Sequence, residues 1–229
     1  MASVPVGLTD NLPAGRVMRA WVEGAELVVW RSASGKLSAW DNRCPHRGMR
    51  LSHGFVRGES LACIYHGWHY GTEGQCHYIP AHPELTPHKS ICTVSHEITE
   101  QNGVLWVTQQ SQTDLPPIPA GLQAVRTITF ECPPDLLLDC LGNSEIVDEN
   151  GVRLLAGKTP SFPMMLTYSA DTSDFIVILL VQKVVEHSAN VHMLCSQHWS
   201  VAGKVSLSRW CDATRRRVED LHDSAGVER

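Results

Sequence analysis

The chain has 229 residues, of which 43% are hydrophobic and 19% charged, and this composition suits a soluble globular protein of one or two domains. The net charge of -5 argues against a broad basic surface for nucleic acid. The longest aliphatic or aromatic run, Phe175–Val181, is far too short to span a bilayer, and residues 1–16 lack the pattern of a secretory signal. The sequence therefore predicts a cytoplasmic protein with neither nucleic acid nor membrane as a partner.

The first half of the chain consists of short strand-like runs separated by turn residues. Leu27–Trp30 and Leu37–Trp40 predict two strands. The pair Asn102-Gly103 is a strong hairpin signal directly before the apolar run Val104–Val107. Because no long helical period interrupts these runs, we expect a small all-β domain over residues 1–113.

A proline-rich segment follows this half. Residues 114–120 contain Pro116, Pro117 and Pro119. Because proline fixes φ and removes a backbone donor, this composition predicts a stiff linker between two domains. The second domain is then expected over residues 121–229.

The second half combines long apolar runs with one helical pattern. Phe175–Val181 predicts a fully buried strand, Ser188–Asn190 a turn, and Val191–Trp199 a returning strand. Trp210–His222 carries apolar residues close to helical spacing and predicts a helix. We therefore expect a mixed α and β structure here.

Histidine and cysteine are unusually frequent and are clustered. The chain has 12 histidines and 8 cysteines, and many of both lie between residues 44 and 96. A chain without an export signal is not expected to rely on disulfides. Cysteine clustered with histidine in a reducing compartment instead indicates a metal centre.

Two short loops combine the residue types that hold such a centre. Cys44 and His46 stand in the first loop, and Cys63 and His66 stand in the second, with 16 residues between the loops. A [2Fe-2S] cluster between facing loops would take the two cysteines on one iron and the two histidines on the other, which is the Rieske arrangement. Two neutral imidazoles in place of two thiolates make the cluster less negative, so its potential rises to roughly −150 to +300 mV.

Two other interpretations of these four residues stay open. Two cysteines and two histidines also suit one tetrahedral zinc ion. Zinc fingers usually pair cysteine with cysteine and histidine with histidine along the chain, whereas each loop here mixes the two types. Each loop also has a glycine soon afterwards, Gly48 or Gly67. The four residues could also be unrelated loop residues, but the mixed spacing favours the Rieske cluster.

The motifs around these residues resemble a known family. Cys44–Gly48, Leu51–Gly54 and Cys63–Trp68 are similar to the Rieske domain of the Rieske non-haem iron oxygenases. The similarity is greatest to the oxygenase subunits that include vanillate and dicamba demethylases, and Ile79–Pro83 is similar to the Rieske oxygenases of saxitoxin biosynthesis. The resemblance implies an all-β Rieske domain followed by an α+β domain of the helix-grip type, which is shortened here.

The resemblance also separates this chain from the respiratory Rieske proteins. Those proteins carry an additional cysteine in each loop, and the two form a disulfide, whereas Met49 and Tyr65 stand at these places here. The family pattern therefore implies the oxygenase or ferredoxin type, with Trp40 and Trp68 packed around the cluster. The remaining cysteines are expected to be small buried side chains rather than ligands: Cys76, Cys92, Cys132, Cys140, Cys195 and Cys211.

An oxygenase of this family also needs a mononuclear Fe(II) bound by two histidines and one carboxylate. The family's Asp-x-x-His motif does not occur in residues 111–229. Leu136–Cys140 and Glu145–Gly151 resemble the segments on either side of it, and the ligand helix that should lie between them is missing. The sequence therefore does not support a mononuclear Fe(II), and it assigns no catalytic residue.

Three residues are the candidates for a rebuilt iron site. Asp220 matches the position of the family's carboxylate ligand on a late helix. His187 and His192 flank the predicted turn and could meet across a hairpin, with Asp220 or Glu186 as the third ligand. The alternative is that both histidines are exposed residues beside a turn and that Asp220 is a solvated helix carboxylate.

The resemblance implies a redox function with three open versions. In the first, the chain is an oxygenase component that accepts electrons from an NAD(P)H-linked flavin reductase, often through a ferredoxin, and acts on a small molecule. In the second, it is an electron-transfer or regulatory Rieske protein without oxygenase activity. In the third, it is an internally deleted, inactive oxygenase whose second domain folds poorly. The family assembly is a ring-shaped homotrimer, and a mixed trimer with an intact oxygenase subunit suits the second version.

Overall fold

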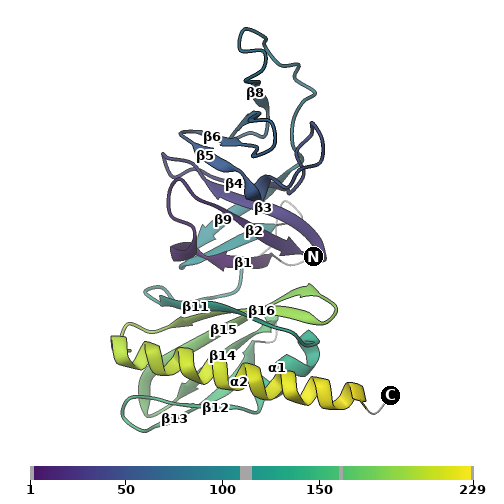
Figure 1. Cartoon of the computed structure of the whole chain (residues 1–229). Helices are drawn as coiled ribbons and strands as arrows, with labels where there is room; N and C mark the ends of the chain where they lie inside the picture. Colours follow the sequence, from purple (N-terminus) through teal and green to yellow (C-terminus); the bar gives the residue numbers. More distant parts are fainter. Residues whose placement is uncertain (1–2, 109–114, 160–161, 228–229) are drawn as a thin grey trace. The chain divides into compact units, whose positions relative to one another are not determined.

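The chain divides into two compact units, Met1–Asp114 and Leu115–Arg229 (Figure 1). The computed structural model describes residues 3–108, 115–159 and 162–227. Of the predicted linker, Asp114 lies outside the described residues, and Leu115–Pro119 forms neither helix nor strand. Among the described residues, no helix combines the length and the apolar character needed to cross a bilayer.

The first unit is built on a six-stranded antiparallel sheet. A short 3-10 helix, η1 (Thr9–Asn11), follows its first strand. In spatial order the strands are β1 (Val4–Leu8), β10 (Val104–Thr108), β9 (Ser95–Gln101), β4 (Leu37–Asp41), β3 (Ala25–Arg31) and β2 (Val17–Val22). The predicted strands and hairpin are confirmed. Asn102 and Gly103 join β9 to β10 with φ of 50° and 80°, a left-handed conformation that these two residue types tolerate.

A smaller antiparallel sheet lies between β4 and β9 in the chain. The 3-10 helix η2 (Leu51–His53) precedes it, and its strands are β5 (Phe55–Arg57), β6 (Ser60–Ala62), β7 (His69–Gly71) and β8 (Cys76–Tyr78). Trp30 and Trp40 are fully buried in an edge-to-face pair and pack in one core with Cys44, Cys63 and Tyr70. The core of this unit therefore holds the bases of both predicted metal loops.

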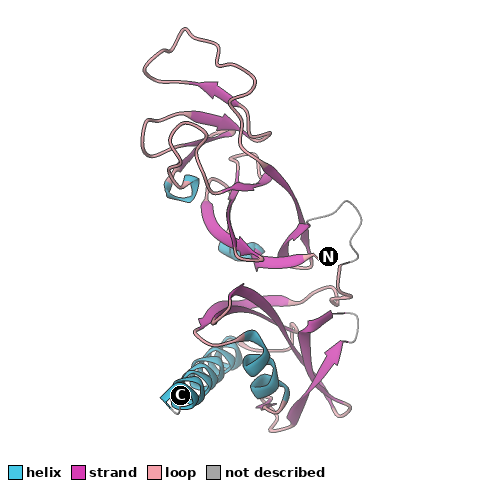
Figure 2. Cartoon of the chain, turned by 90° about the vertical axis from the view of Figure 1, so that its right-hand side faces the viewer, coloured by secondary structure: helices cyan, strands magenta, loops and turns pink. Residues whose placement is uncertain are grey.

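The second unit is a six-stranded antiparallel sheet with two helices. In spatial order the strands are β11 (Gln123–Phe130), β16 (Ser188–Cys195), β15 (Ser173–Val185), β14 (Phe162–Ala170), β13 (Arg153–Thr159) and β12 (Glu145–Val147). Figure 2 shows α1 (Pro134–Gly142) and α2 (Val201–Val227) against the same face of this sheet. The arrangement is the predicted α+β, helix-grip-like fold.

The long helix is held on the sheet by one buried stripe. Leu207, Cys211 and Val218 recur at helical spacing on α2 and are fully or almost fully buried. They share a core with Val177 and Leu179, which alternate along β15 and therefore point to the same face. This core is separate from the core that holds the metal loops.

Three predicted boundaries in the second unit are wrong. The turn lies at Glu186 and His187, and Ser188–Asn190 belongs to β16. These residues form part of a strand rather than a turn because β16 pairs with β15 on one side and with β11 on the other. The returning strand ends at Cys195 rather than at Trp199.

The helix α2 also begins earlier and ends later than the predicted range. Ser200 caps its first turn by accepting a hydrogen bond from Gly203 N–H at 3.1 Å. The Glu149 carboxylate accepts a hydrogen bond from Ser200 N–H at 2.8 Å. Since Glu149 lies far from this turn along the chain, hydrophobic periodicity alone did not reveal the start of the helix.

Candidate metal centre

The two loops that carry the cysteines and histidines have the same backbone geometry. In each loop the cysteine N–H donates to the carbonyl five residues later, and its carbonyl accepts from the glycine N–H four residues later. The four bonds are Cys44 to Met49 at 2.8 Å, Gly48 to Cys44 at 2.8 Å, Cys63 to Trp68 at 2.9 Å and Gly67 to Cys63 at 2.9 Å. Gly48 and Gly67 have φ of 69° and 68°, which side-chain-bearing residues rarely adopt. The sequence thus builds two matching knuckles, each with its cysteine at the base.

The two thiols lie together in the core. Cys44 is 4% exposed and Cys63 is 3% exposed. The neighbouring Cys63 thiol, the Tyr70 hydroxyl and the backbone N–H groups of His46 and Arg47 lower the pKa of Cys44 to about 5, although burial opposes them. The adjacent Cys44 and burial raise the pKa of Cys63. This environment stabilises a thiolate, the form of cysteine that binds metal.

The two imidazoles lie together closer to solvent. The ring centroids of His46 and His66 are 4.7 Å apart. His66 is exposed and His46 is half-buried. Trp68 stacks on His46 with centroids 4.1 Å apart and planes within 5°, and Tyr65 packs on His66 at 3.8 Å. Each imidazole ring is therefore packed against an aromatic side chain.

This donor set fits a cluster of two irons. The thiols form a buried pair and the imidazoles an outer pair, as expected when each pair binds its own iron. Among the described residues, no group of three or more His, Cys, Asp or Glu side chains is arranged to hold one metal ion. A tetrahedral zinc ion would need all four donors around one point. The geometry therefore favours the Rieske interpretation over zinc.

Tyr70 is a feature of this centre that the motifs did not predict. Its hydroxyl lies 3.0 Å from Cys44 Sγ in the buried core. Burial and the adjacent Cys44 raise the pKa of Tyr70, so the hydroxyl keeps its proton and can donate it to the thiolate in a hydrogen bond. Tyr70 lies on β7, directly after the second loop. Its position just past the Cys63–Trp68 motif is a sequence signal that could have found it.

The other predicted cluster neighbours are partly confirmed. Trp40 lies in the cluster core and Trp68 packs against it. Of the cysteines expected to be buried, Cys140 is only half-buried and Cys92 is exposed. Cys92 precedes β9 and forms an isolated β-bridge with Gln75 outside the named strands. The buried members of that group are Cys76, Cys132, Cys195 and Cys211.

In the second unit, His192 is buried inside the sheet. It lies on β16, opposite Leu180 of β15 and Thr127 of β11. Its Nδ1 lies 2.9 Å from Thr127 Oγ1, and its Nε2 lies 3.2 Å from Gln182 Oε1. Both ring nitrogens therefore have hydrogen-bond partners within the sheet.

The other two candidate ligands lie elsewhere in this unit. His187 is exposed in the β15–β16 turn, and its ring stacks on His222 with centroids 5.4 Å apart. Asp220 is exposed on α2. The structure thus pairs His187 with a histidine that was not among the predicted ligands.

The connection where the family's ligand helix was expected is short and well bonded. Only Asn143 and Ser144 separate α1 from β12. Asn143 Nδ2 donates to Asp139 O at 2.8 Å, and Ser144 Oγ donates to Cys140 O at 2.6 Å. Tyr168 donates to Leu141 O at 2.7 Å. The carbonyls of Asp139, Cys140 and Leu141 near the end of α1 therefore have hydrogen-bond partners.

Comparison with known proteins agrees with this geometry. A family model described as Rieske [2Fe-2S] domain matches residues 2–107. The oxidoreductase NdmD of Pseudomonas putida is 42% identical over 106 residues, which are 45% of this chain and 18% of that protein. A 3-chlorobenzoate-3,4-dioxygenase oxygenase subunit of Comamonas testosteroni is 37% identical over 112 residues, which are 48% of this chain and 26% of that protein. The matched segments thus span about a quarter or less of these relatives.

Solved structures match both units. NdmA of Pseudomonas putida CBB5 superposes with a TM-score of 0.75 at 18% identity, covering 95% of this chain and 80% of that one. Apo dicamba monooxygenase superposes with a TM-score of 0.73 at 20% identity, covering 99% and 88%. At these identities the match establishes the fold.

The first unit is therefore a Rieske [2Fe-2S] domain, and its cofactor is a [2Fe-2S] cluster. The relatives and solved structures that match this chain include Rieske oxygenase components, in agreement with the resemblance of its motifs.

Proposed function

We propose that the chain is a one-electron Rieske oxidoreductase of the oxygenase-component type. In this proposal Cys44 and Cys63 bind the inner iron of the cluster, and His46 and His66 bind the outer iron. The observation that carries it is the graded burial of the donors: the thiols are almost fully buried, and His66 is exposed. An electron can then enter or leave through the imidazole side, while the sulfur side is kept from water.

The cluster supplies a centre that takes up one electron at a time. The residues around the cluster set its reduction potential. The Tyr70 hydroxyl, 3.0 Å from Cys44 Sγ, donates a hydrogen bond that stabilises the more negative, reduced state. Trp68 and Tyr65 hold the two imidazoles in place, so little rearrangement accompanies electron transfer.

The proposed electron donor is an NAD(P)H-linked flavin reductase or a ferredoxin. Next to His66, Ile64 and Tyr65 are 49% and 52% exposed. Large apolar side chains at such exposure beside a redox ligand provide a contact area for a transient partner. The assembly proposed from the family is a homotrimer or a mixed trimer.

We further propose that the chain has lost the family's mononuclear-iron site. The sequence lacks the Asp-x-x-His motif after residue 110. The two ring nitrogens of His192 lie close to Thr127 and Gln182, and His187 stacks on His222 instead of meeting His192. In this proposal, oxygen activation on a small-molecule substrate takes place at an intact oxygenase subunit of a mixed trimer.

One observation favours a complete oxygenase as the second candidate. The superposition with apo dicamba monooxygenase covers 99% of this chain, so the second unit keeps that scaffold. The bonded connection at Asn143 and Ser144 and the continuous core also argue against a poorly folded deletion product.

Metal analysis of the purified chain separates these candidates. We expect two irons and two acid-labile sulfides per chain, and a reduced form with the low average g value of mixed nitrogen and sulfur coordination. Colourless protein after reconstitution would overturn the cluster assignment. A third iron, together with substrate-dependent O2 consumption by the chain alone, would instead support the complete oxygenase.

A further inference from the structure

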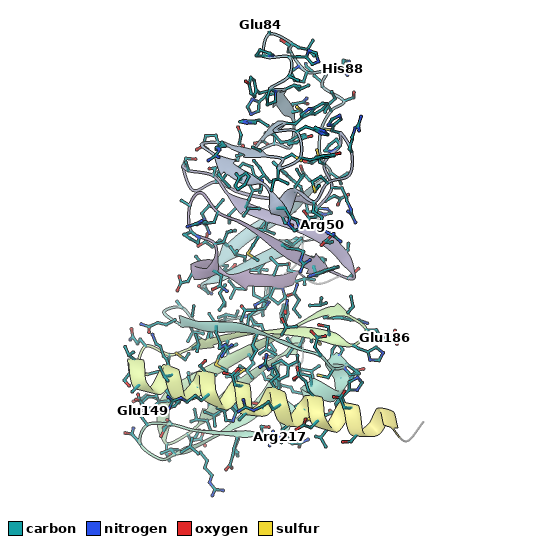
Figure 3. The ribbon with its side chains drawn as sticks, in the orientation of Figure 1. Arg50, Glu84, His88, Glu149, Glu186 and Arg217 are labelled. Atoms are coloured by element: carbon teal, nitrogen blue, oxygen red, sulfur yellow. The ribbon has the colours of Figure 1, made fainter. Side chains whose placement is uncertain are left out.

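One corner of the second unit brings together three distant segments of the chain. Ala189 of β16 pairs with Phe130 of β11, next to the β15–β16 turn. One residue further along, Glu131 N–H donates to the Glu219 carboxylate of α2 at 3.0 Å. Figure 3 shows Glu186 at the end of this hairpin. The turn, the end of β11 and the last turns of α2 therefore meet.

Two imidazoles from different elements face each other at this corner. His187 lies in the turn, and His222 lies on α2. Their ring centroids are 5.4 Å apart, and their planes differ by 23°. Val218, four residues before His222 and therefore on the same helix face, is 0% exposed. The packing of α2 against the sheet thus sets the position of the His222 ring.

We propose that His187 and His222 form a bidentate site for a divalent transition-metal ion of the Zn²⁺, Ni²⁺ or Cu²⁺ class. Imidazole nitrogen is a preferred ligand of these ions. With metal–nitrogen distances of about 2.0–2.1 Å and adjacent ligands at about 90–110°, the centroids of two ligating rings lie about 4.5–5.3 Å apart. The observed 5.4 Å needs only a small rotation of the exposed His187 ring.

The surrounding charges favour a cation. Glu186 and Asp223 are the chain neighbours of the two histidines, and both are exposed. Glu219 lies one turn before His222 on the same helix face. Lys183, on β15 near the turn, is an exposed positive charge on this hairpin. The carboxylates outnumber it, so the local field attracts a divalent ion.

This site differs from the family's iron centre. In the described part of the chain, no third His, Cys, Asp or Glu joins such a pair to complete a metal group. Water would fill the other positions, and the ion would exchange readily. We expect a bound ion to link the hairpin turn to the C-terminal half of α2 and so to stabilise the folded second unit.

The test uses the full chain with its cluster, titrated with zinc chloride in a calorimeter. We expect one saturable Zn²⁺ per chain. His187→Ala and His222→Ala should each weaken binding about 10- to 100-fold, because a chelate reduced to one imidazole loses its second, effectively intramolecular contact. The double variant keeps neither imidazole and should show no saturable zinc binding at this site.

His198→Ala is the matched control. His198 is exposed in the same unit, and its Nδ1 lies 3.0 Å from Asp174 O, outside the pair. Zinc should raise the Tm of the wild type and of this control, and EDTA should reverse the shift. His187 lies in an exposed turn, so its variant should fold, and far-UV circular dichroism checks this.

Wild-type zinc affinity in the double variant, or no saturable zinc binding by the wild type, would overturn the proposal. The cluster absorbance, read in the same samples, reports separately on the Rieske centre. Failure of the zinc site therefore leaves the proposed electron-transfer function untouched, and loss of the cluster leaves the zinc result interpretable.

Discussion

The histidines of the candidate cluster site in the first unit and His192 of the second unit lie in opposite environments. In the first unit, His46 and His66 lie at the tips of two glycine-terminated knuckles, with aromatic rings packed on them. In the second unit, His192 is buried in the sheet between Thr127 and Gln182. A ligand histidine needs a fixed ring with a nitrogen open to the metal, whereas a structural histidine has its nitrogens bonded within the protein. This chain contains histidines in both kinds of environment.

The two units also differ in how local their candidate sites are. The Rieske loops are local, since each knuckle is closed by two backbone hydrogen bonds within six residues. The resemblance implies a ligand helix for a mononuclear iron in the second unit, whereas only Asn143 and Ser144 connect α1 to β12 here. The core of the second unit draws residues from both helices and from strands β11 to β16, so it does not depend on any one connection between them.

The largest expected effect comes from breaking the first site. Cys44→Ser removes a buried thiolate ligand, so the cluster should be lost completely, with its visible absorption and its acid-labile sulfide. Cys92→Ser is the matched control, because Cys92 is exposed, and it should keep the cluster. Full cluster content in Cys44→Ser would mean that the ligand assignment is wrong.

The independence of the two cores can be tested next. Leu179 is 0% exposed in the core of the second unit, and Leu179→Ala should lower its free energy of unfolding by about 2–5 kcal/mol. Urea titrations should follow α2 by far-UV circular dichroism and the cluster by visible absorbance. Only the circular dichroism transition is expected to shift.

Leu155→Ala is the control for this experiment. Leu155 is 63% exposed on β13, so its truncation should change stability by less than about 0.5 kcal/mol. If the circular dichroism and absorbance transitions shift together in Leu179→Ala, the two units unfold as one. The two cores would then not contribute to stability independently.

A smaller effect should follow from tuning the cluster without removing it. Tyr70→Phe deletes the hydroxyl 3.0 Å from Cys44 Sγ. Loss of a hydrogen bond worth about 1 kcal/mol corresponds to a potential lower by about 40 mV for one electron. Voltammetry on the folded protein measures this shift. Tyr78→Phe, at an exposed tyrosine of the same sheet, should leave the potential unchanged.

The smallest effect concerns acid stability of the second unit. Although burial opposes it, hydrogen bonds from Ser173 and from the N–H groups of Val152 and Asn150 lower the pKa of Asp148. A lowered folded-state pKa means that this stabilisation is present above the ordinary carboxyl pKa and is lost as the pH falls through the folded-state value.

Asp148→Asn should therefore destabilise the second unit at neutral pH, and the difference from wild type should shrink on acidification. Urea midpoints followed by circular dichroism from pH 7 downward measure this. A difference that stayed constant with pH would show that the carboxylate charge is not what holds the turn between β12 and β13.

Much of the first unit follows from local pattern. The apolar runs gave β3 and β4, and Asn102 with Gly103 gave a hairpin whose φ values only such residues adopt readily. The four proposed cluster donors could be found from the sequence because mixed cysteine and histidine knuckles need few residues and a glycine at a fixed offset. Tyr70 was missed, because its contact with Cys44 crosses from a strand to a loop.

The second unit was harder to predict because distant contacts set its boundaries. Glu149 fixes the start of α2 through Ser200, and pairing with both β15 and β11 moves the hairpin turn to Glu186 and His187. Neither contact leaves a local signature.

The sequence by itself indicated the cofactor, because the proposed ligands, their spacing and their glycines lie within two short segments whose backbone folds locally. It also determined that the family's Asp-x-x-His motif is absent after residue 110. Only the tertiary structure decided what the remaining histidines do. His192 meets Thr127 across a strand ladder, and His187 meets His222 across a helix–sheet contact. Such pairings depend on packing between segments far apart in the chain, which residue spacing does not encode.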